Sequence, residues 1–271
     1  MRAQPNSVPD RGIVVRIGDV AVNLRTNDHA YRRKLRNHYK PFVGPMENAE
    51  FSFDIELTDS GINDPEDEVS VKRSSSFWCF QRGDFHAEWN MASNTGTIRQ
   101  SANLYSIDAA LRIFHTVVLA ARGGFLLHAA SAIRNGRAFV FMGASGAGKT
   151  TIASLAPLDA TLLTDEVSYI GSDSAGYRAF GTPFAGELAK CGENVSAPIS
   201  VVYLLAQGGT NQIERISASD AVRMLLANTL FFAQDHDLIR SVFQSVCRLV
   251  DQIPVHRLTF VPDACVWEDI V

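Results

Sequence analysis

Eight residues, GASGAGKT at positions 143–150, constrain the fold of this chain more than any other stretch of its sequence. They match the pattern G-x-x-x-x-G-K-[ST] at every fixed position, and the apolar run AFVFM at 138–142 precedes them directly. In this pattern glycines let the backbone curl so that several N–H groups point at one phosphate, with a strand before the loop and a helix after it. The loop therefore predicts an α/β chain that binds a phosphorylated ligand.

The same loop predicts a bound nucleotide and a metal ion. Lys149 is expected to reach the β- and γ-phosphate oxygens, and the Thr150 hydroxyl is expected to ligate Mg²⁺. We therefore predict ATP and Mg²⁺ as cofactors, with GTP and pyrophosphate left open because no motif identifies the base. A glycine-rich turn that binds nothing is the alternative interpretation. The residues predicted to bind the nucleotide are Gly143, Ala144, Ser145, Gly146, Ala147, Gly148, Lys149, Thr150 and Thr151.

An acidic pair follows the loop. Asp165 and Glu166 come directly after the residues TLLT, in a segment expected to form a strand over 160–171. Phosphoryl transfer needs an acid that holds the metal and a residue that accepts the proton of the attacking hydroxyl. We predict that Asp165 ligates the metal together with Thr150 and that Glu166 is the base. An exposed acidic pair at a strand end is the alternative, because most carboxylates lie at the surface.

A histidine precedes the loop in the run FLLHAAS. We expect a strand over 125–133, joined to the strand at 138–143 by a turn at Asn135 and Gly136. This pairing would place His128 near the phosphates and the acidic pair, where it could act in catalysis. The alternative is a hydrogen-bonded core histidine, which is the more common role for a single histidine on an apolar strand.

The composition excludes several classes of protein. Hydrophobic residues make up 46% of the 271 residues, which is enough for a packed core, and the net charge of −4 argues against a nucleic-acid-binding protein. We find no uninterrupted apolar run that would span a membrane and no signal peptide, so we predict a cytoplasmic protein without a membrane partner. The four cysteines are scattered, which predicts free thiols rather than a zinc site.

The remaining patterns divide the chain into three parts. We expect a flexible tail over 1–11, an antiparallel β-rich N-terminal domain over 12–105, and an α/β catalytic domain over 106–271. Helical spacing of apolar residues predicts the helix 106–124. Further elements are expected as strands at 199–208 and 255–261 and helices at 217–232 and 235–253.

The ordered set of His128, GASGAGKT and Asp165-Glu166 resembles the catalytic core of the HPr kinase/phosphorylase family, whose fold is related to phosphoenolpyruvate carboxykinase. The resemblance covers about residues 125–190. It implies a mixed sheet with a P-loop and an ATP- and Mg²⁺-dependent kinase that phosphorylates a serine hydroxyl. In that family one acid is the base, the other helps to hold Mg²⁺, and the histidine lies near the base. The resemblance also implies self-association as a homo-oligomer.

Two departures from that family bear on the acceptor. The family's Asp-Asp pair is Asp-Glu here, so either Asp165 or Glu166 can be the base. The segment YRAFGTPFAGELAK at 177–190 is similar to that of HPr kinase-related proteins of unassigned substrate, among which lasso-peptide precursor kinases are the best-understood relatives. This segment either borders the acceptor site or forms only a rigid turn. Its candidate acceptor-binding residues are Arg178, Gly181, Thr182, Glu187 and Lys190.

Three functions of different classes follow. The first is a kinase that transfers the γ-phosphate to a hydroxyl of a peptide, protein or small molecule. The second is a nucleotide-binding regulatory protein without phosphotransfer, which the Asp-Glu departure favours. The third is an NTPase coupled to motion, which the hairpin-like turn before the loop disfavours, because ordinary P-loop ATPases have a βαβ crossover there.

Overall fold

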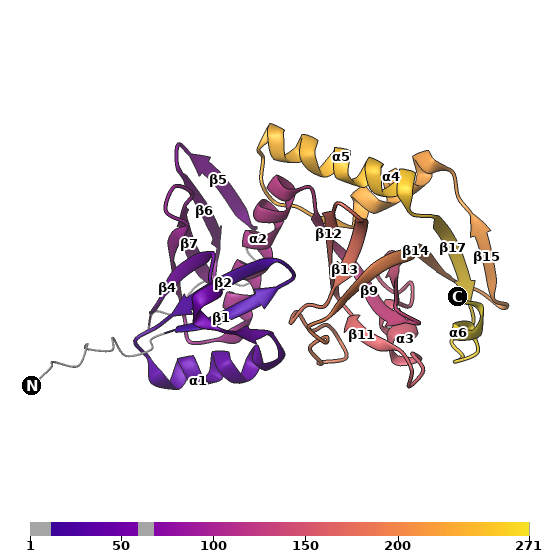
Figure 1. Cartoon of the computed structure of the whole chain (residues 1–271), viewed down its shortest axis with the longest axis horizontal. Helices are drawn as coiled ribbons and strands as arrows, with labels where there is room; N and C mark the ends of the chain where they lie inside the picture. Colours follow the sequence, from indigo (N-terminus) through magenta and orange to yellow (C-terminus); the bar gives the residue numbers. More distant parts are fainter. Residues whose placement is uncertain (1–11, 59–67, 271) are drawn as a thin grey trace, which may run out of the picture.

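The computed structural model describes residues 12–58 and 68–270, and the tail expected over 1–11 lies outside them. Two large mixed sheets make up the protein, with few helices. In Figure 1 the N-terminal and C-terminal sheets lie side by side, and helix α2 (Leu104–Arg122) lies between them. The expected α/β class is confirmed at this level.

The N-terminal sheet has eight strands. In sheet order they are β3 (Val43–Gly44), β1 (Gly12–Ile17), β2 (Val20–Arg25), β4 (Phe51–Leu57), β8 (Thr95–Gln100), β7 (Phe85–Asn90), β6 (Phe77–Arg82) and β5 (Ser70–Ser74). The prediction of an antiparallel sheet is wrong at its centre, because β4 pairs in parallel with both β2 and β8. Helix α1 (His29–His38) carries the chain back before β4 begins, so β4 runs in the same direction as β2.

Aromatic packing joins α2 to the N-terminal sheet. The Phe114 ring makes edge-to-face contacts with Phe51, Phe53 and Trp89, with ring centroids 5.0, 5.1 and 5.1 Å apart. Phe51 and Phe53 are buried on one face of β4, as the alternating pattern of that strand predicts. These contacts place α2 in the core of the N-terminal sheet, although the sequence assigned this helix to the C-terminal domain.

Helix α2 also packs on the C-terminal part. Its core cluster includes Leu126, Val167 and Phe184 from that part of the chain. The helix begins after Asn103, whose side chain accepts a hydrogen bond from the Ser106 N–H, and ends at Gly123 in the left-handed conformation. By length and composition α2 could cross a membrane. However, 67% of its apolar segment is buried inside the protein, which is typical of a core helix.

The C-terminal sheet is built around two long strands. In sheet order its main strands are β10 (Arg137–Met142), β9 (Phe125–Arg134), β12 (Val167–Asp173), β13 (Gly176–Phe180), β14 (Ser196–Gln207), β17 (Val255–Phe260) and β15 (Gln212–Arg215). Strand β14 also pairs with β10, so β10, β9, β12, β13 and β14 close into a ring. β14 lies parallel to both β10 and β17.

The strand expected over 160–171 is two strands. β11 (Thr161–Thr164) pairs with the second half of β9, and β12 pairs with the first half, with Asp165 and Glu166 between them. The Thr164 hydroxyl stabilises this break, because it accepts hydrogen bonds from the backbone N–H groups of Glu166 and Val167, both at 3.1 Å. The acidic pair therefore lies at a kink inside the sheet rather than at the end of one strand.

Helices and short elements complete the C-terminal part. They are α3 (Lys149–Ser154), α4 (Ala218–Asn228), β16 (Thr229–Leu230), α5 (His236–Gln252) and α6 (Val266–Asp269). The helix expected over 217–232 is too long, because the chain leaves the helix after Asn228 and Thr229-Leu230 pair with β9. The turn at Asn135 and Gly136 is confirmed: both have positive φ and connect the antiparallel strands β9 and β10. The four cysteines are free, as predicted.

Candidate functional site

The glycine loop, residues 143–150, connects β10 to α3, as the sequence predicts. The backbone φ is 77° at Gly146 and 104° at Gly148, values that residues with a side chain rarely adopt. Gly148 also lacks room for a side chain, because a Cβ there would lie 2.7 Å from the Phe260 ring. At Gly143 an added Cβ would lie 2.8 Å from the Ala147 side chain. The shape of this loop therefore requires glycine at specific positions.

Lys149 folds back over the glycine loop. Its Nζ donates hydrogen bonds to the carbonyl oxygens of Gly143 at 3.0 Å and Ala144 at 3.2 Å. An ammonium group has three N–H donors, so one remains for another partner. Burial lowers the pKa of Lys149, while the nearby carboxylates of Glu166 and Glu187 raise it. The ammonium group therefore lies within the electrostatic influence of Glu166, which is 17 positions away from Lys149 in the sequence.

Strand pairing brings His128 and Glu166 together. His128 is opposite Val167 in the antiparallel pair β9–β12, and the Ala129 N–H donates to the Glu166 carbonyl oxygen at 3.1 Å. The His128 Nε2 and Glu166 Oε2 atoms are 3.8 Å apart, an ion-pair distance, and about a third of each side chain is exposed. The two residues that the sequence placed near each other therefore face a common, partly open space.

The charges around Glu166 keep it ionised. Its interaction with His128 lowers the pKa of the Glu166 carboxyl most strongly, and the charges of Arg112 and Lys149 lower it further, against the effect of burial. A carboxylate in this state can accept a proton or a cation at neutral pH. Glu166 therefore has cationic groups from two separate elements around it, Lys149 of α3 and Arg112 of α2.

Asp165 makes contacts that the sequence did not predict. It is 1% exposed, and its Oδ1 and Oδ2 atoms accept hydrogen bonds from the backbone N–H groups of Gly186 at 2.9 Å and Leu188 at 2.8 Å. Asp165 thus holds the segment 183–190 against the kink between β11 and β12. Among the described residues no group of three or more His, Cys, Asp or Glu side chains is placed to hold a metal ion. The role of Asp165 as a metal ligand together with Thr150 stays a prediction.

Gly181 and Thr182 anchor the segment that follows β13. The Thr182 hydroxyl donates to the Val167 carbonyl oxygen at 2.8 Å, and the Thr182 N–H donates to the Leu163 carbonyl oxygen at 3.1 Å. A Cβ at Gly181 would lie 1.8 Å from the Glu193 carbonyl oxygen. Both residues are buried. These contacts give them a structural role, which corresponds to the rigid-turn interpretation of the segment.

The charged candidates of this segment separate in space. Arg178 lies away from the glycine loop: its guanidinium donates to the Ser196 carbonyl oxygen and hydroxyl, both at 3.1 Å, and it lines another cavity with Arg122. Glu187 and Lys190 are exposed, and only Glu187 affects the pKa of Lys149. The roles of Arg178, Glu187 and Lys190 in acceptor binding stay predictions.

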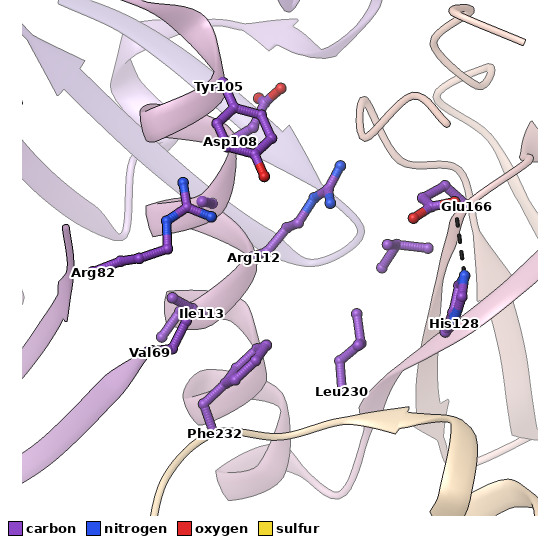
Figure 2. Close-up of a pocket in the computed structure, with 12 residues that line it drawn as sticks. Val69, Arg82, Tyr105, Asp108, Arg112, Ile113, His128, Glu166, Leu230 and Phe232 are labelled. Atoms are coloured by element: carbon purple, nitrogen blue, oxygen red, sulfur yellow. Dashed lines mark ion pairs between the residues drawn. The ribbon is translucent and has the colours of Figure 1, made fainter. Parts of the chain in front are cut away.

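A cavity opens beside Glu166, on the side of α2 (Figure 2). Its volume is about 240 Å³, and it lies between the N-terminal sheet and the C-terminal sheet. We call it the Arg112 cavity. Residues that line it include Arg82, Asp108, Arg112, His128, Glu166 and Phe232.

The sequence analysis missed the part of this cavity that comes from α2. Within the largely apolar stretch 107–121, Asp108 and Arg112 are the only Asp, Glu, Lys or Arg residues. They are four positions apart, so they share one face of the helix. That pattern was a usable signal. Arg82 gave no such signal, because it lies in a strand with other polar residues.

The family model of SynChlorMet cassette protein ScmC matches residues 95–271 of the chain. The chain belongs to this family. The matched region begins in β8 and contains α2, the glycine loop, His128 and the acidic pair. No curated protein matches the chain.

The region that matches the ScmC family, residues 95–271, includes both cationic residues around Glu166, Lys149 and Arg112. Arg82 lies outside this region. The region shared with the family therefore includes helix α2 and not only the segment from 125 onward.

Proposed function

We propose that this ScmC-family protein is an ATP-dependent kinase that transfers the γ-phosphate to a hydroxyl group. The observation that carries the proposal is the position of Glu166, which lies 3.8 Å from His128 and within the electrostatic influence of Lys149. A phosphate-binding lysine and a proton acceptor next to each other are the two parts that phosphoryl transfer to a hydroxyl needs. The match of residues 143–150 to the P-loop pattern supports nucleotide as the donor.

Lys149, Glu166 and His128 have distinct roles in the proposed reaction. Lys149 binds the β- and γ-phosphate oxygens through its free N–H. Glu166 takes the proton of the acceptor hydroxyl as the oxygen attacks the γ-phosphorus, and the bond from that phosphorus to the ADP oxygen breaks. His128 holds the Glu166 carboxylate in place and provides a path for the proton to solvent. Phosphate monoester and ADP leave as products.

The donor set at the kink fits Mg²⁺. A magnesium ion usually keeps several waters and binds one or two carboxylates plus phosphate oxygens, so it does not need a dedicated cluster of protein ligands. Thr150 and Asp165 would hold it, and when bound it would neutralise charge on the phosphates. Because both Asp165 oxygens already accept backbone hydrogen bonds, Asp165 has less freedom to move than Glu166.

An HPr kinase-like fold is part of the proposal, and the acceptor hydroxyl belongs to a peptide, a protein or a small molecule. The order of histidine, glycine loop and acidic pair along the chain supports the kinase-like fold. The antiparallel hairpin β9–β10 before the loop agrees with this family rather than with ordinary P-loop ATPases. We also propose self-association on the same resemblance, and a cytoplasmic location on the sequence patterns described above.

A regulatory protein that binds nucleotide without transfer is the second candidate. The observation in its favour is the engagement of Asp165, whose carboxylate ties down the segment 183–190. In this case ATP binding would be retained, and no variant at Glu166 would change any chemical step.

Two measurements test the proposal. First, Mg·ATP should raise the melting temperature of the wild type, since ligand at about 100-fold above Kd stabilises the native state by about 2.7 kcal/mol. Lys149→Ala should remove this rise and leave the melting temperature without ligand nearly unchanged. Second, the protein is incubated with γ-labelled ATP, Mg²⁺ and candidate acceptors, which are the products of its neighbouring genes and small hydroxyl compounds. Label should pass to one of these acceptors.

The variant Glu166→Gln separates the two candidates. It should slow label transfer by about 10²- to 10⁴-fold, which is the usual contribution of a general base, with ATP affinity retained. If ATP binds but no label is transferred by the wild type, the regulatory function is supported instead. If Mg·ATP gives no thermal stabilisation of the wild type, both candidates are rejected.

A further inference from the structure

The lining of the Arg112 cavity combines polar and apolar side chains. Arg112 extends from α2 toward Glu166 and His128 on the other side of the cavity. Apolar side chains complete the lining, among them Ile113, Leu230 and Phe232. Ligand sites in proteins usually combine an apolar lining with a few convergent polar groups. At about 240 Å³ the cavity is smaller than the range of about 300–1,000 Å³ for drug-sized ligands, so it suits a small molecule.

Arg112 has no carboxylate partner among the described residues. Its Nε atom is buried and makes no hydrogen bond, and its guanidinium lies over the Phe184 ring at 5.1 Å. Figure 2 shows the Arg112 side chain extending from α2 toward Glu166. A buried polar group without a partner is rare, because its desolvation is not compensated by a hydrogen bond. The arrangement leaves Arg112 free to bind an anion.

The other charged groups of the cavity are already paired. Arg82 makes a bidentate ion pair with Asp84, with distances of 2.5 and 2.6 Å. Asp108 accepts hydrogen bonds from His38 Nε2 at 2.9 Å and from the Tyr39 hydroxyl at 2.6 Å. Of the two arginines that line the cavity, Arg112 is therefore the one that has no carboxylate partner among the described residues.

Glu166 divides the nucleotide side from the cavity side. Lys149 and Arg112 both lower the pKa of Glu166, yet only Glu166 and His128 of the proposed catalytic residues line the cavity. No residue of the glycine loop lines it. A base must contact the acceptor hydroxyl, so the acceptor has to approach Glu166 from a side that the nucleotide does not occupy. The Arg112 cavity is such a side.

We propose that the Arg112 cavity binds the phosphate acceptor, and that this acceptor is a small hydroxy acid with an apolar substituent. Its carboxylate pairs with Arg112, its hydroxyl lies at Glu166, and its apolar group packs on Leu230 and Phe232. This inference rests on the proposed kinase function for the role of the hydroxyl, but the binding of the acid does not depend on nucleotide. A planar guanidinium suits a carboxylate because it can donate two parallel hydrogen bonds.

The test uses 3-phenyllactate as the probe, which carries an aromatic ring, a hydroxyl and a carboxylate. Its affinity for the full-length protein is measured by calorimetric titration without nucleotide, next to that of 3-phenyllactamide, in which an amide replaces the carboxylate. We expect the acid to bind and the amide to bind about 10- to 100-fold more weakly, the usual value of one hydrogen-bonded charge. Arg112→Gln should lower the affinity for the acid by the same factor and leave the affinity for the amide unchanged.

Matched variants make each outcome decisive. Arg240→Gln removes an exposed arginine of α5 and should leave both affinities unchanged, and Arg112→Lys should recover part of the affinity for the acid. Lys149→Ala should not affect the probe, which separates this inference from the nucleotide site. Equal binding of acid and amide by the wild type, or no binding of either, would overturn the inference even if ATP binds. Binding of the acid by a protein that does not bind ATP would reject the kinase and keep the anion site.

Discussion

The glycine loop and the Arg112 cavity lie on two sides of Glu166, and the chain builds them in different ways. The loop takes all its residues from one stretch, 143–150, and its shape follows from glycines at fixed positions. The cavity takes its residues from α2, β6, β9, β12 and β16, which are spread over more than half of the chain. A binding site made by local backbone conformation is visible in a sequence, whereas one made by packing between sheets depends on the whole fold. The predictions below test whether the two sides are independent.

The largest effect is expected at Gly148. Gly148→Ala would put a side chain at a φ of 104° and within 2.7 Å of the Phe260 ring, so the loop has to change shape. We expect ATP affinity to fall about 100-fold, from backbone strain and overpacking together. Fluorescence titration with a labelled ATP analogue measures this change.

A matched variant sharpens the test. Gly146 also has a positive φ, but an added Cβ there would have no atom within 4 Å. Gly146→Ala should therefore lower ATP affinity less than Gly148→Ala does. Neither variant should change the affinity for 3-phenyllactate. Equal losses in the two variants would mean that contact with Phe260 is not important, and a loss of probe binding would mean that the two sides are coupled.

The second effect is expected at the kink that both sides share. Thr164→Val keeps the shape of the side chain but removes the acceptor of two backbone N–H groups, those of Glu166 and Val167. We expect the free energy of unfolding to fall by about 2 kcal/mol, because each buried donor without a partner costs about 1–3 kcal/mol. Urea unfolding followed by circular dichroism measures it.

Thr161→Val, on the same strand β11, is the control and should cost less, since no described hydrogen bond involves its hydroxyl. If both variants have the same stability, the Thr164 hydroxyl does not hold the kink.

A third, smaller effect comes from His115, which lies in α2 between the two sheets. Burial lowers the pKa of His115 from 6.5 to about 4, and its Nδ1 donates to the Leu111 carbonyl oxygen. The unfolded chain binds the proton more readily, so stability should be lost as pH falls below 6.5 and the loss should level off near pH 4. Between pH 7 and 5.5 we expect a loss of about 1 kcal/mol from this residue.

The measurement is urea unfolding at both pH values for wild type and His115→Leu. Whatever its free energy of unfolding at either pH, the variant should show a change between the two pH values that is about 1 kcal/mol smaller than that of the wild type. The same pH dependence in the two proteins would contradict the assignment of the shift to His115.

The smallest effect is expected at Arg178. Because its guanidinium donates to Ser196 and lines a separate cavity, Arg178→Gln should change ATP affinity and label transfer by less than about twofold. Arg112→Gln should slow label transfer by at least about tenfold, through weaker acceptor binding. Kinetic assays on the two variants in parallel test this contrast. A larger effect at Arg178 would return the acceptor site to the segment 177–190.

Local signals in the sequence predicted most of the elements. Glycines, the Asn135-Gly136 turn and the alternation in β4 act over a few residues, so they identify strands and turns without knowledge of the fold. The errors lie where tertiary contacts override these signals. Strand β4 runs parallel because α1 and the β5–β7 strands separate it from its partners in the sequence. The end of α4 becomes β16 because β9 offers a free edge for pairing.

The sequence alone determined the residues of the proposed nucleotide side: the loop at 143–150, the candidate histidine before it and the acidic pair after it lie within about forty positions of one another. Only the tertiary structure decided that Glu166 meets His128 across β9 and β12, that Asp165 ties down the segment 183–190, and that Arg112 lies at the same site. The physical reason is range. Backbone conformation depends on neighbouring residues, whereas the position of a side chain on α2 relative to a kink some fifty residues later depends on how two sheets pack against one helix.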